Sequence, residues 1–260
     1  MTVFMGRRHN KDCALLPADF ASSGLVVNRI GPPPTRFQVL GERSSGTNLA
    51  SRLLARNSHM QPSDALGWKH GFPAAIAIPA DLAVICMVRN AAGWARSMHA
   101  KPWHTAAEMQ AMEFSEFLRA PWHSTIDRPR YFPASKGMVG QPLQQDRDPQ
   151  SGCAFANLFA LRRAKLTGLI SYLNRGCTCV VLRIETLQAE PETIVDAVLS
   201  GLDQPARITP FRPVVKRLGS RFKAAIQSRP ATPDHLAEKD LAFLRTQTDP
   251  DQEALLGYVY

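Results

Sequence analysis

Residues 41–48, G-E-R-S-S-G-T-N, have the composition and spacing of an anion-binding loop. The two glycines form the pattern G-x-x-x-x-G, after a short apolar run and before a segment with leucines at helical spacing. In a strand–loop–helix unit, successive backbone N–H groups of such a loop form a concave anion site at the helix N-terminus. Hydroxyl groups and one arginine add donors and charge. We therefore predict a phosphate site formed by Gly41, Arg43, Ser44, Ser45, Gly46, Thr47 and Asn48.

The loop lacks the residues that bind magnesium nucleotides. A nucleotide triphosphatase has Lys and then Ser or Thr after the second glycine, where they contact the terminal phosphates and Mg²⁺. Thr47 and Asn48 occupy those positions here. The sequence therefore favours a phosphate site without magnesium. The alternative is a Gly/Ser turn that only caps a helix.

Arg89 and Ser97 form a second candidate anion site. Arg89 directly follows an apolar run, and Ser97 comes eight residues later in a helical segment. Ligands of open α/β sheets bind outside the carboxyl ends of the strands, so an arginine at such an end is placed to contact a phosphate. A serine about two helical turns further on can contact the same anion.

Three apolar runs, each followed by a helical pattern, must position these residues. The runs and the patterns that follow them are at residues 36–40 and 49–55, 82–88 and 94–100, and 179–184 and 191–202. The run L-A-V-I-C-M-V is typical of a strand covered on both faces. Alternating strands and helices imply right-handed crossovers. The sequence predicts an α/β fold with three layers, α/β/α, and a mostly parallel central sheet of the P-loop type.

The remaining segments fit one domain with an insertion. Residues 1–35 are interrupted by Pro and Gly, which predicts an irregular lead-in to a domain at residues 36–260. Residues 102–150 are less regular, with two short helices near 105–118. Long irregular segments in compact domains are usually functional, so we expect this insertion to be a lid or a substrate-binding segment.

Two further helices are expected in the second half of the chain. One covers residues 153–173, where apolar side chains at helical spacing face inward and Arg162, Arg163 and Lys165 face outward. The other is a surface helix at residues 233–245.

The charge of the chain favours acidic ligands. Its 260 residues include 31 basic and 22 acidic side chains, which gives a net charge of +9 and a pI near 9.7. Nucleic acid, an anionic membrane, a polyanionic glycan or a phosphate-rich cosubstrate would suit this charge. The basic residues are scattered, without zinc-finger spacing or an aromatic RNA-binding strand. We therefore expect no sequence-specific nucleic-acid partner.

Other features bear on compartment and metal binding. No apolar run approaches the roughly 20 residues that span a bilayer. The N-terminal residues lack the apolar core of a secretory signal, so we expect a cytoplasmic protein. The five cysteines have C-T-C as their only close pair, which suits neither a disulfide framework nor a zinc knuckle. Buried free thiols are the expectation.

Three stretches together resemble the sulfotransferases that use 3′-phosphoadenosine 5′-phosphosulfate (PAPS). They are residues 45–47 (S-G-T), 88–99 (V-R-N-A-A-G-W-A-R-S-M-H) and 183–191 (R-I-E-T-L-Q-A-E-P). In that family an S-G-T loop holds the 5′-phosphosulfate, and an Arg with a Ser eight positions later holds the 3′-phosphate. The third stretch is similar to the family's strand-end segment Y-E-D-L…P. The resemblance implies PAPS as cosubstrate and no metal.

The sequence departs from the family's pattern in three places. Asn-Ala replaces the usual Asp-Pro after Arg89. Ser44 stands where many members have Lys or Arg, and the basic residue here is Arg43. The C-terminal R-K-G-x-x-G loop is absent, and Lys216 and Arg217 are the candidates that replace it at the 3′-phosphate.

His70 is the predicted catalytic base. Residues 68–73, W-K-H-G-F-P, are similar to the K-x-H-x-P stretch that carries the catalytic histidine of cytosolic sulfotransferases, although Lys and His are adjacent here. Imidazole titrates near neutrality and suits the removal of a proton from an alcohol. Lys69 is the candidate for stabilising charge on the bridging oxygen, and Arg43, with the loop amides, is the candidate for holding the leaving 5′-phosphate. The alternatives for the base are His99, His104, Glu42 and Glu185.

The expected activity is sulfuryl transfer from PAPS to a hydroxyl or amine of a small-molecule or glycan acceptor. Aromatic residues of the insertion are candidates to stack on that acceptor: Trp103, Trp122, Tyr131 and Phe132. One alternative is a phosphotransferase of the nucleotide-kinase kind. Another is a nucleotide- or polyanion-binding module without catalysis.

Overall fold

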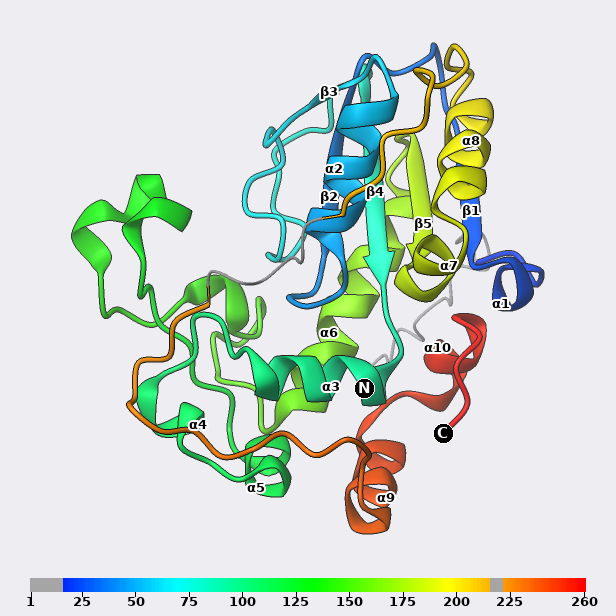
Figure 1. Ribbon diagram of the computed structural model, residues 1–260. Helices are drawn as coiled ribbons and strands as arrows, with labels where there is room; N and C mark the ends of the chain where they lie inside the picture. The colour runs from blue at the N-terminus through cyan, green and yellow to red at the C-terminus, as the bar shows by residue number, and fades with distance from the viewer. Residues whose placement is uncertain (1–15, 216–221) are drawn as a thin grey trace, which may run out of the picture.

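A mostly parallel sheet forms the centre of the computed structural model, which describes residues 16–215 and 222–260. Within these residues the sheet has five strands in the order β1–β5–β4–β2–β3 (Figure 1). They are β1 (Leu25–Asn28), β2 (Arg36–Gly41), β3 (Gln61–Pro62), β4 (Leu82–Val88) and β5 (Cys179–Arg183). All neighbouring pairs are parallel except β1 and β5. The predicted α/β class and mostly parallel sheet are confirmed.

Strand β4 is buried along its whole length, as its continuous apolar run predicts. Its alternate side chains enter two different hydrophobic clusters, one on each face of the sheet. Ile85 and Met87 belong to one cluster, and Val84 and Cys86 belong to the other. Both faces of the central strand are therefore covered.

Helices cover each face of the sheet. Helices α2 (Thr47–Asn57), α7 (Ile184–Ala189) and α8 (Pro191–Gly201) contribute to the first cluster. Helix α6 (Leu158–Ile170) and the 3₁₀ turn η4 (Ser171–Asn174) contribute to the second. In Figure 1, α2 and α8 lie on the side of the sheet opposite to α6.

A third hydrophobic cluster lies beyond the carboxyl ends of the parallel strands, at the lower end of Figure 1. It joins α3 (Ala91–Ala100), α5 (Phe114–Arg119) and α9 (Glu238–Gln247) to the first turns of α6. Trp94 and Phe159 are among its buried side chains. This cluster supports the segments that follow β4.

The segment before residue 36 is not wholly irregular, contrary to the prediction. It contains the short helix α1 (Phe20–Ser23) and the edge strand β1, whose Leu25 lies opposite Leu182 of β5. Phe20 is fully buried. A four-residue antiparallel edge strand is too short for periodicity to identify.

The insertion at residues 102–150 contains two short helices, as predicted, α4 (Ala107–Gln110) and α5. The 3₁₀ turns η1 (Pro129–Tyr131), η2 (Pro133–Met138) and η3 (Gln144–Asp146) follow. At the other end of the chain, the expected helix at residues 233–245 begins later, as α9, and is followed by α10 (Pro250–Leu255). Pro250 at the start of α10 separates the two helices.

Two charged residues of α6 are buried, although the sequence predicts them to face outward. Arg162 is fully buried and Lys165 is 5% exposed, whereas Arg163 is exposed as predicted. Each buried charge has an acidic partner far away in sequence. Arg162 pairs with Glu42 at 2.8 Å, and Lys165 lies 3.4 Å from Asp146. Helical periodicity carries no information about such partners.

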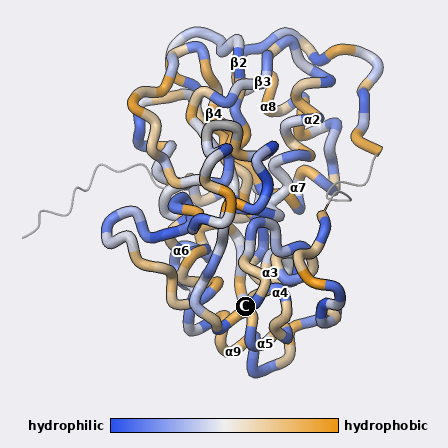
Figure 2. Tube along the Cα trace, turned by 90° about the vertical axis from the view of Figure 1, so that its left-hand side faces the viewer, coloured by the Kyte–Doolittle hydropathy of each residue, from blue (hydrophilic) through white to orange (hydrophobic). Residues whose placement is uncertain are grey.

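The helices carry both hydrophilic and hydrophobic residues in Figure 2. Of the helices in residues 16–215 and 222–260, none is long and apolar enough to cross a membrane. Cys86, Cys177 and Cys179 are buried free thiols, as expected, while Cys153 is exposed. Cys13 lies outside the described residues.

Candidate functional site

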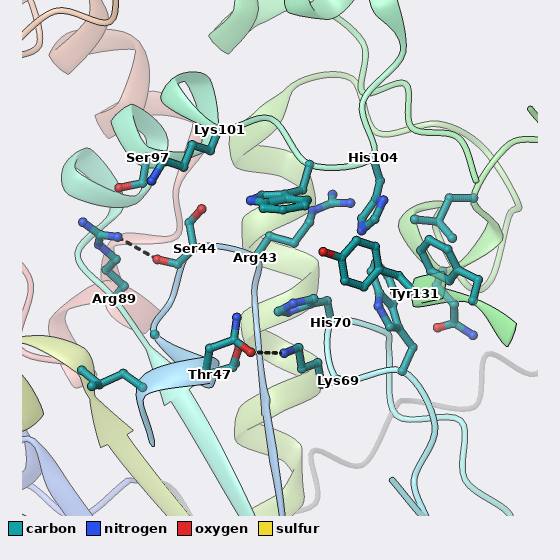
Figure 3. Close-up of a pocket in the computed structure, with 18 of the residues that line it drawn as sticks. Arg43, Ser44, Thr47, Lys69, His70, Arg89, Ser97, Lys101, His104 and Tyr131 are labelled. Carbon is teal, nitrogen blue, oxygen red and sulfur yellow. Dashed lines mark hydrogen bonds between the residues drawn. The ribbon is translucent and has the colours of Figure 1, made fainter. Parts of the chain in front are cut away.

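A cavity of about 1790 Å³ opens at the carboxyl ends of β2 and β4. One part is lined by the loop that follows β2, by Arg89 and by Ser97. The other part is lined by side chains from the insertion at residues 102–150. Figure 3 shows both parts, with Arg89 on one side and His104 and Tyr131 on the other. From the sequence we expect a nucleotide in the first part and an acceptor in the second, and we therefore call them the nucleotide half and the acceptor half.

The loop between β2 and α2 has a backbone that suits anion binding. Gly46 caps α2 with φ +91°, a conformation that favours glycine. A Cβ atom at this position would lie 2.2 Å from Ile184 Cδ1, so a larger residue would require the Ile184 side chain to shift. The first intrahelical bonds run from the N–H groups of Leu49 and Ala50 to the Gly46 carbonyl. The N–H groups in the preceding turn point out of the helix end, toward an incoming anion.

The predicted loop residues divide into two groups. Arg43, Ser44, Gly46, Thr47 and Asn48 line the cavity. Gly41 and Ser45 do not line it and instead shape the loop. The Ser45 hydroxyl donates to the Glu42 carbonyl at 2.7 Å, and a Cβ at Gly41 would lie 2.6 Å from Ser45 Oγ.

Arg43 is held in a buried ion pair. Its Nη2 lies 2.6 Å from Asp146 Oδ2, and its guanidinium packs near the rings of Trp68 and Trp122. The Asp146 carboxylate balances the arginine charge, and Arg43 together with Lys165 holds the pKa of Asp146 well below its usual range despite burial. Arg43 therefore positions the loop, and its charge is shared with Asp146. The sequence prediction missed Asp146, which is 103 residues away.

Arg89 lies beside the loop, as predicted. Its Nη1 donates to the Ser44 carbonyl at 2.7 Å, and burial lowers its pKa. In Figure 3 the side chains of Ser97 and Lys101 lie near each other and face the Arg89 guanidinium. Within the described residues, no acidic side chain forms an ion pair with Lys101. Two cations and a hydroxyl therefore converge here.

Lys101 was not among the residues predicted from the sequence, although the sequence carries a signal for it. Lys101 is the C-cap residue of α3, four residues after Ser97, and the Lys101 N–H donates to the Ser97 carbonyl at 3.0 Å. Its backbone is no longer helical, with φ −141° and ψ 74°. A cation that directly follows the helix of the candidate serine is therefore visible in the sequence once α3 is assigned.

His70 is tied to the end of β2. Its Nδ1 lies 2.6 Å from the Gly41 carbonyl oxygen, and the Gly41 N–H donates to the Lys69 carbonyl at 3.0 Å. Because a carbonyl only accepts hydrogen bonds, Nδ1 carries the proton and Nε2 keeps its lone pair. Burial, reinforced by the nearby charges of Lys69 and Arg43, lowers the pKa of His70 well below 6.5. The ring is neutral at physiological pH and can accept a proton at Nε2.

Lys69 links this segment to α2. Its Nζ donates to Asn48 Oδ1 at 2.6 Å, and burial lowers its pKa. Figure 3 shows Lys69 and Thr47 on the same side of the cavity, below His70. An ammonium group next to the helix N-terminus adds positive charge where the loop amides converge.

Three of the four alternatives for the base lie away from the cavity. Glu42 is buried against Arg162, and Glu185 accepts hydrogen bonds from the Asn90 N–H and the Tyr258 hydroxyl. His99 is enclosed by Thr232 and the Met112 carbonyl. None of these three side chains lines the cavity.

His104 does line the cavity. Its Nδ1 lies 2.5 Å from Asp127 Oδ1, and its backbone has φ +63°, an uncommon conformation for a non-glycine residue. Burial lowers the pKa of His104, and the carboxylate of Asp127 opposes that effect. The cavity therefore presents two imidazoles, His70 in the nucleotide half and His104 in the acceptor half.

Aromatic rings enclose the acceptor half. Trp68, Trp103, Tyr131 and Phe132 line it, and each lies within 6.2 Å of the His104 ring, measured between centroids. Trp122, also a candidate for stacking, is buried, and its Nε1 donates to Asp146 at 3.2 Å. It supports the buried Arg43 pair and does not line the cavity.

The two predicted C-terminal cations, Lys216 and Arg217, lie outside the described residues. Pro213 and Val214, which precede them, line the edge of the cavity.

In the described part of the chain, no group of three or more His, Cys, Asp or Glu side chains is arranged to hold a metal ion.

Comparisons with known proteins give no family assignment. The chain matches no model of a known protein family, no curated protein and no solved structure.

Proposed function

We propose that the chain is a sulfotransferase that uses PAPS, built on a three-layer α/β/α fold of the P-loop type. The observation that carries this proposal is the contact between Arg89 and the phosphate loop. The Arg89 guanidinium, 2.7 Å from the Ser44 carbonyl, faces Ser97 and Lys101 beside the loop amides. Two neighbouring anion sites suit a nucleotide with phosphates at both the 5′ and the 3′ position.

Each phosphate of the nucleotide would bind its own set of residues. The 5′-phosphate would bind the N–H groups of Gly46, Thr47 and Asn48 at the start of α2. The 3′-phosphate would bind Arg89, together with Ser97 and Lys101. A guanidinium and an ammonium provide charge-assisted hydrogen bonds to phosphate, which are stronger than neutral ones.

The chemical step would be an in-line transfer. The bond between sulfur and the 5′-phosphate oxygen breaks as sulfur bonds to the acceptor oxygen, and the acceptor proton passes to His70 Nε2. Lys69 would stabilise the negative charge that develops on the leaving phosphate oxygen. Such a reaction depends on positioning and positive charge more than on covalent catalysis.

The acceptor would be a small molecule or a glycan that carries a hydroxyl or an amine. The rings of Trp68, Trp103 and Tyr131 offer flat apolar surfaces to either. His104, oriented by Asp127, is a hydrogen-bonding group for the same molecule.

A thermal-shift titration tests the proposal against its alternatives. Adenosine 3′,5′-bisphosphate without magnesium should raise the melting temperature, and the shift should grow with the logarithm of the ligand concentration above its dissociation constant. Stabilisation by ATP only with magnesium would instead favour a kinase. Stabilisation by heparin alone, lost steeply with added salt, would favour a polyanion-binding module. Either of these outcomes would contradict the sulfotransferase proposal.

A further inference from the structure

The turn that carries Arg89 is held at three successive residues by groups from three different segments. The Arg89 carbonyl accepts from Arg162 Nη2 at 2.7 Å. The Asn90 N–H donates to Glu185 at 2.9 Å, and the Ala91 N–H donates to the Tyr260 hydroxyl at 2.7 Å. The backbone at the end of β4 is therefore fixed by side chains from α6, α7 and the segment after α10.

Arg162 also reaches the phosphate loop. Its Nη1 donates to Glu42 Oε2 at 2.8 Å, and Glu42 directly follows Gly41 at the end of β2. Its Nε and Nη2 donate to the two carboxylate oxygens of Glu253 at 2.7 and 3.0 Å. One planar, fully buried guanidinium thus connects the loop after β2 to the turn after β4.

Tyr260 completes the connection. Its hydroxyl donates to Glu253 Oε2 at 2.9 Å while it accepts from the Ala91 N–H. Ala91 is fully buried, and the Tyr260 hydroxyl is the hydrogen-bond partner of its N–H. Without this hydroxyl the turn would lose one of its three anchors, and the Glu253 carboxylate would lose a donor.

We propose that Arg162, held by Glu253 and Tyr260, is a positioning residue that sets the separation between the two anion sites. The inference rests on the proposed function, because it assumes one nucleotide that occupies both sites. The second phosphate of such a ligand adds affinity only where the distance between the two sites equals the distance between its two phosphates. Arg162 contacts neither phosphate and acts through the backbone of the Arg89 turn and the Glu42 side chain.

Calorimetry with three ligands separates this role from general stabilisation. The ligands are adenosine 3′,5′-bisphosphate, adenosine 5′-monophosphate and adenosine 3′-monophosphate, each measured with the full chain. The Tyr260→Phe variant should weaken the bisphosphate by roughly 5- to 10-fold, the effect of one lost buried hydrogen bond. Both monophosphates should stay within about 2-fold of their wild-type affinity, because each site remains intact.

Two other variants test the same role, one at Arg162 and one at a control tyrosine. Arg162→Lys should weaken the bisphosphate more than Tyr260→Phe does, because an ammonium cannot replace a guanidinium that bridges Glu42, Glu253 and the Arg89 carbonyl. If Arg162→Lys does not fold, Tyr260→Phe still decides the question. Tyr172→Phe is the matched control, since Tyr172 is a buried tyrosine of the second hydrophobic cluster, and it should change none of the three affinities.

The outcomes distinguish the inference from the proposed function. An equal loss of affinity for all three ligands in Tyr260→Phe, or no loss for any, would overturn the positioning role. If the wild-type protein itself binds the bisphosphate no more tightly than the monophosphates, the proposed function fails before any variant is considered.

Discussion

The two halves of the cavity are built in different ways. The nucleotide half consists of strand ends, helix ends and the turns beside them, where backbone groups and basic side chains meet the ligand space. The acceptor half consists of irregular segments and 3₁₀ turns, and aromatic side chains form its walls. Sheet and helix hydrogen bonds, together with buried side chains such as Arg43 and Arg162, fix the first half, whereas isolated bridges and turns join the segments of the second. We therefore expect the nucleotide half to be the less tolerant of substitution.

The largest expected effect concerns the base. His70→Ala should lower the turnover rate by about 10²- to 10⁴-fold, because a positioned general base contributes a factor of that size. Nucleotide affinity should change little. Steady-state kinetics with PAPS measures the loss, and His104→Ala is the matched control. A greater loss of turnover in His104→Ala than in His70→Ala would move the base to the acceptor half.

The second prediction concerns the 3′-phosphate. Arg89→Ala should weaken adenosine 3′,5′-bisphosphate by roughly 10- to 100-fold, as expected for a lost charge-assisted hydrogen bond. The affinity for adenosine 5′-monophosphate should fall much less. Lys101→Ala should have a smaller effect in the same direction. Unchanged discrimination between the two nucleotides in Arg89→Ala would show that another group binds the 3′-phosphate.

Two glycine substitutions compare how tightly the two halves are packed. Gly46→Ala should destabilise the fold by about 1–3 kcal/mol from backbone strain, with a further loss from the clash with Ile184. Gly140 in the insertion has a similar φ of +87°, but no atom lies within 4 Å of the Cβ position. Gly140→Ala should therefore cost less. Equal losses in the free energy of unfolding, measured by urea denaturation, would mean that the two halves are packed alike.

The smallest expected effect is a pH dependence of stability. The pKa of His70 is lowered by burial, so below pH 6.5 the unfolded chain binds a proton that the folded state does not. Stability should fall as the pH falls below 6.5, by at most about 1.4 kcal/mol per pH unit for this group. His70→Gln should reduce that slope. An identical slope in both proteins, measured by urea denaturation, would contradict the lowered pKa.

The sequence predicts the nucleotide half better than the acceptor half, for a physical reason. The apolar runs predict both ends of β4 correctly and the end of β2 to within one residue. The loop and Arg89 directly follow these two strand ends, so their positions are predicted as well. The edge strand β1 was missed because it is short and its partner β5 lies far along the chain.

The buried ion pairs could not be predicted. Arg162 and Lys165 follow the helical pattern of surface residues, yet their partners Glu42 and Asp146 neutralise them inside the fold. Asp127, the partner of His104, likewise comes from an irregular segment. Such pairings depend on how loops meet in space, which periodicity does not encode.

Calorimetric titration of the wild-type protein in magnesium-free buffer measures whether the two anion sites bind one nucleotide. We expect adenosine 3′,5′-bisphosphate to bind at least about 10-fold more tightly than adenosine 5′-monophosphate, the gain from one charge-assisted contact to the 3′-phosphate. Equal affinities for the two nucleotides would contradict this expectation.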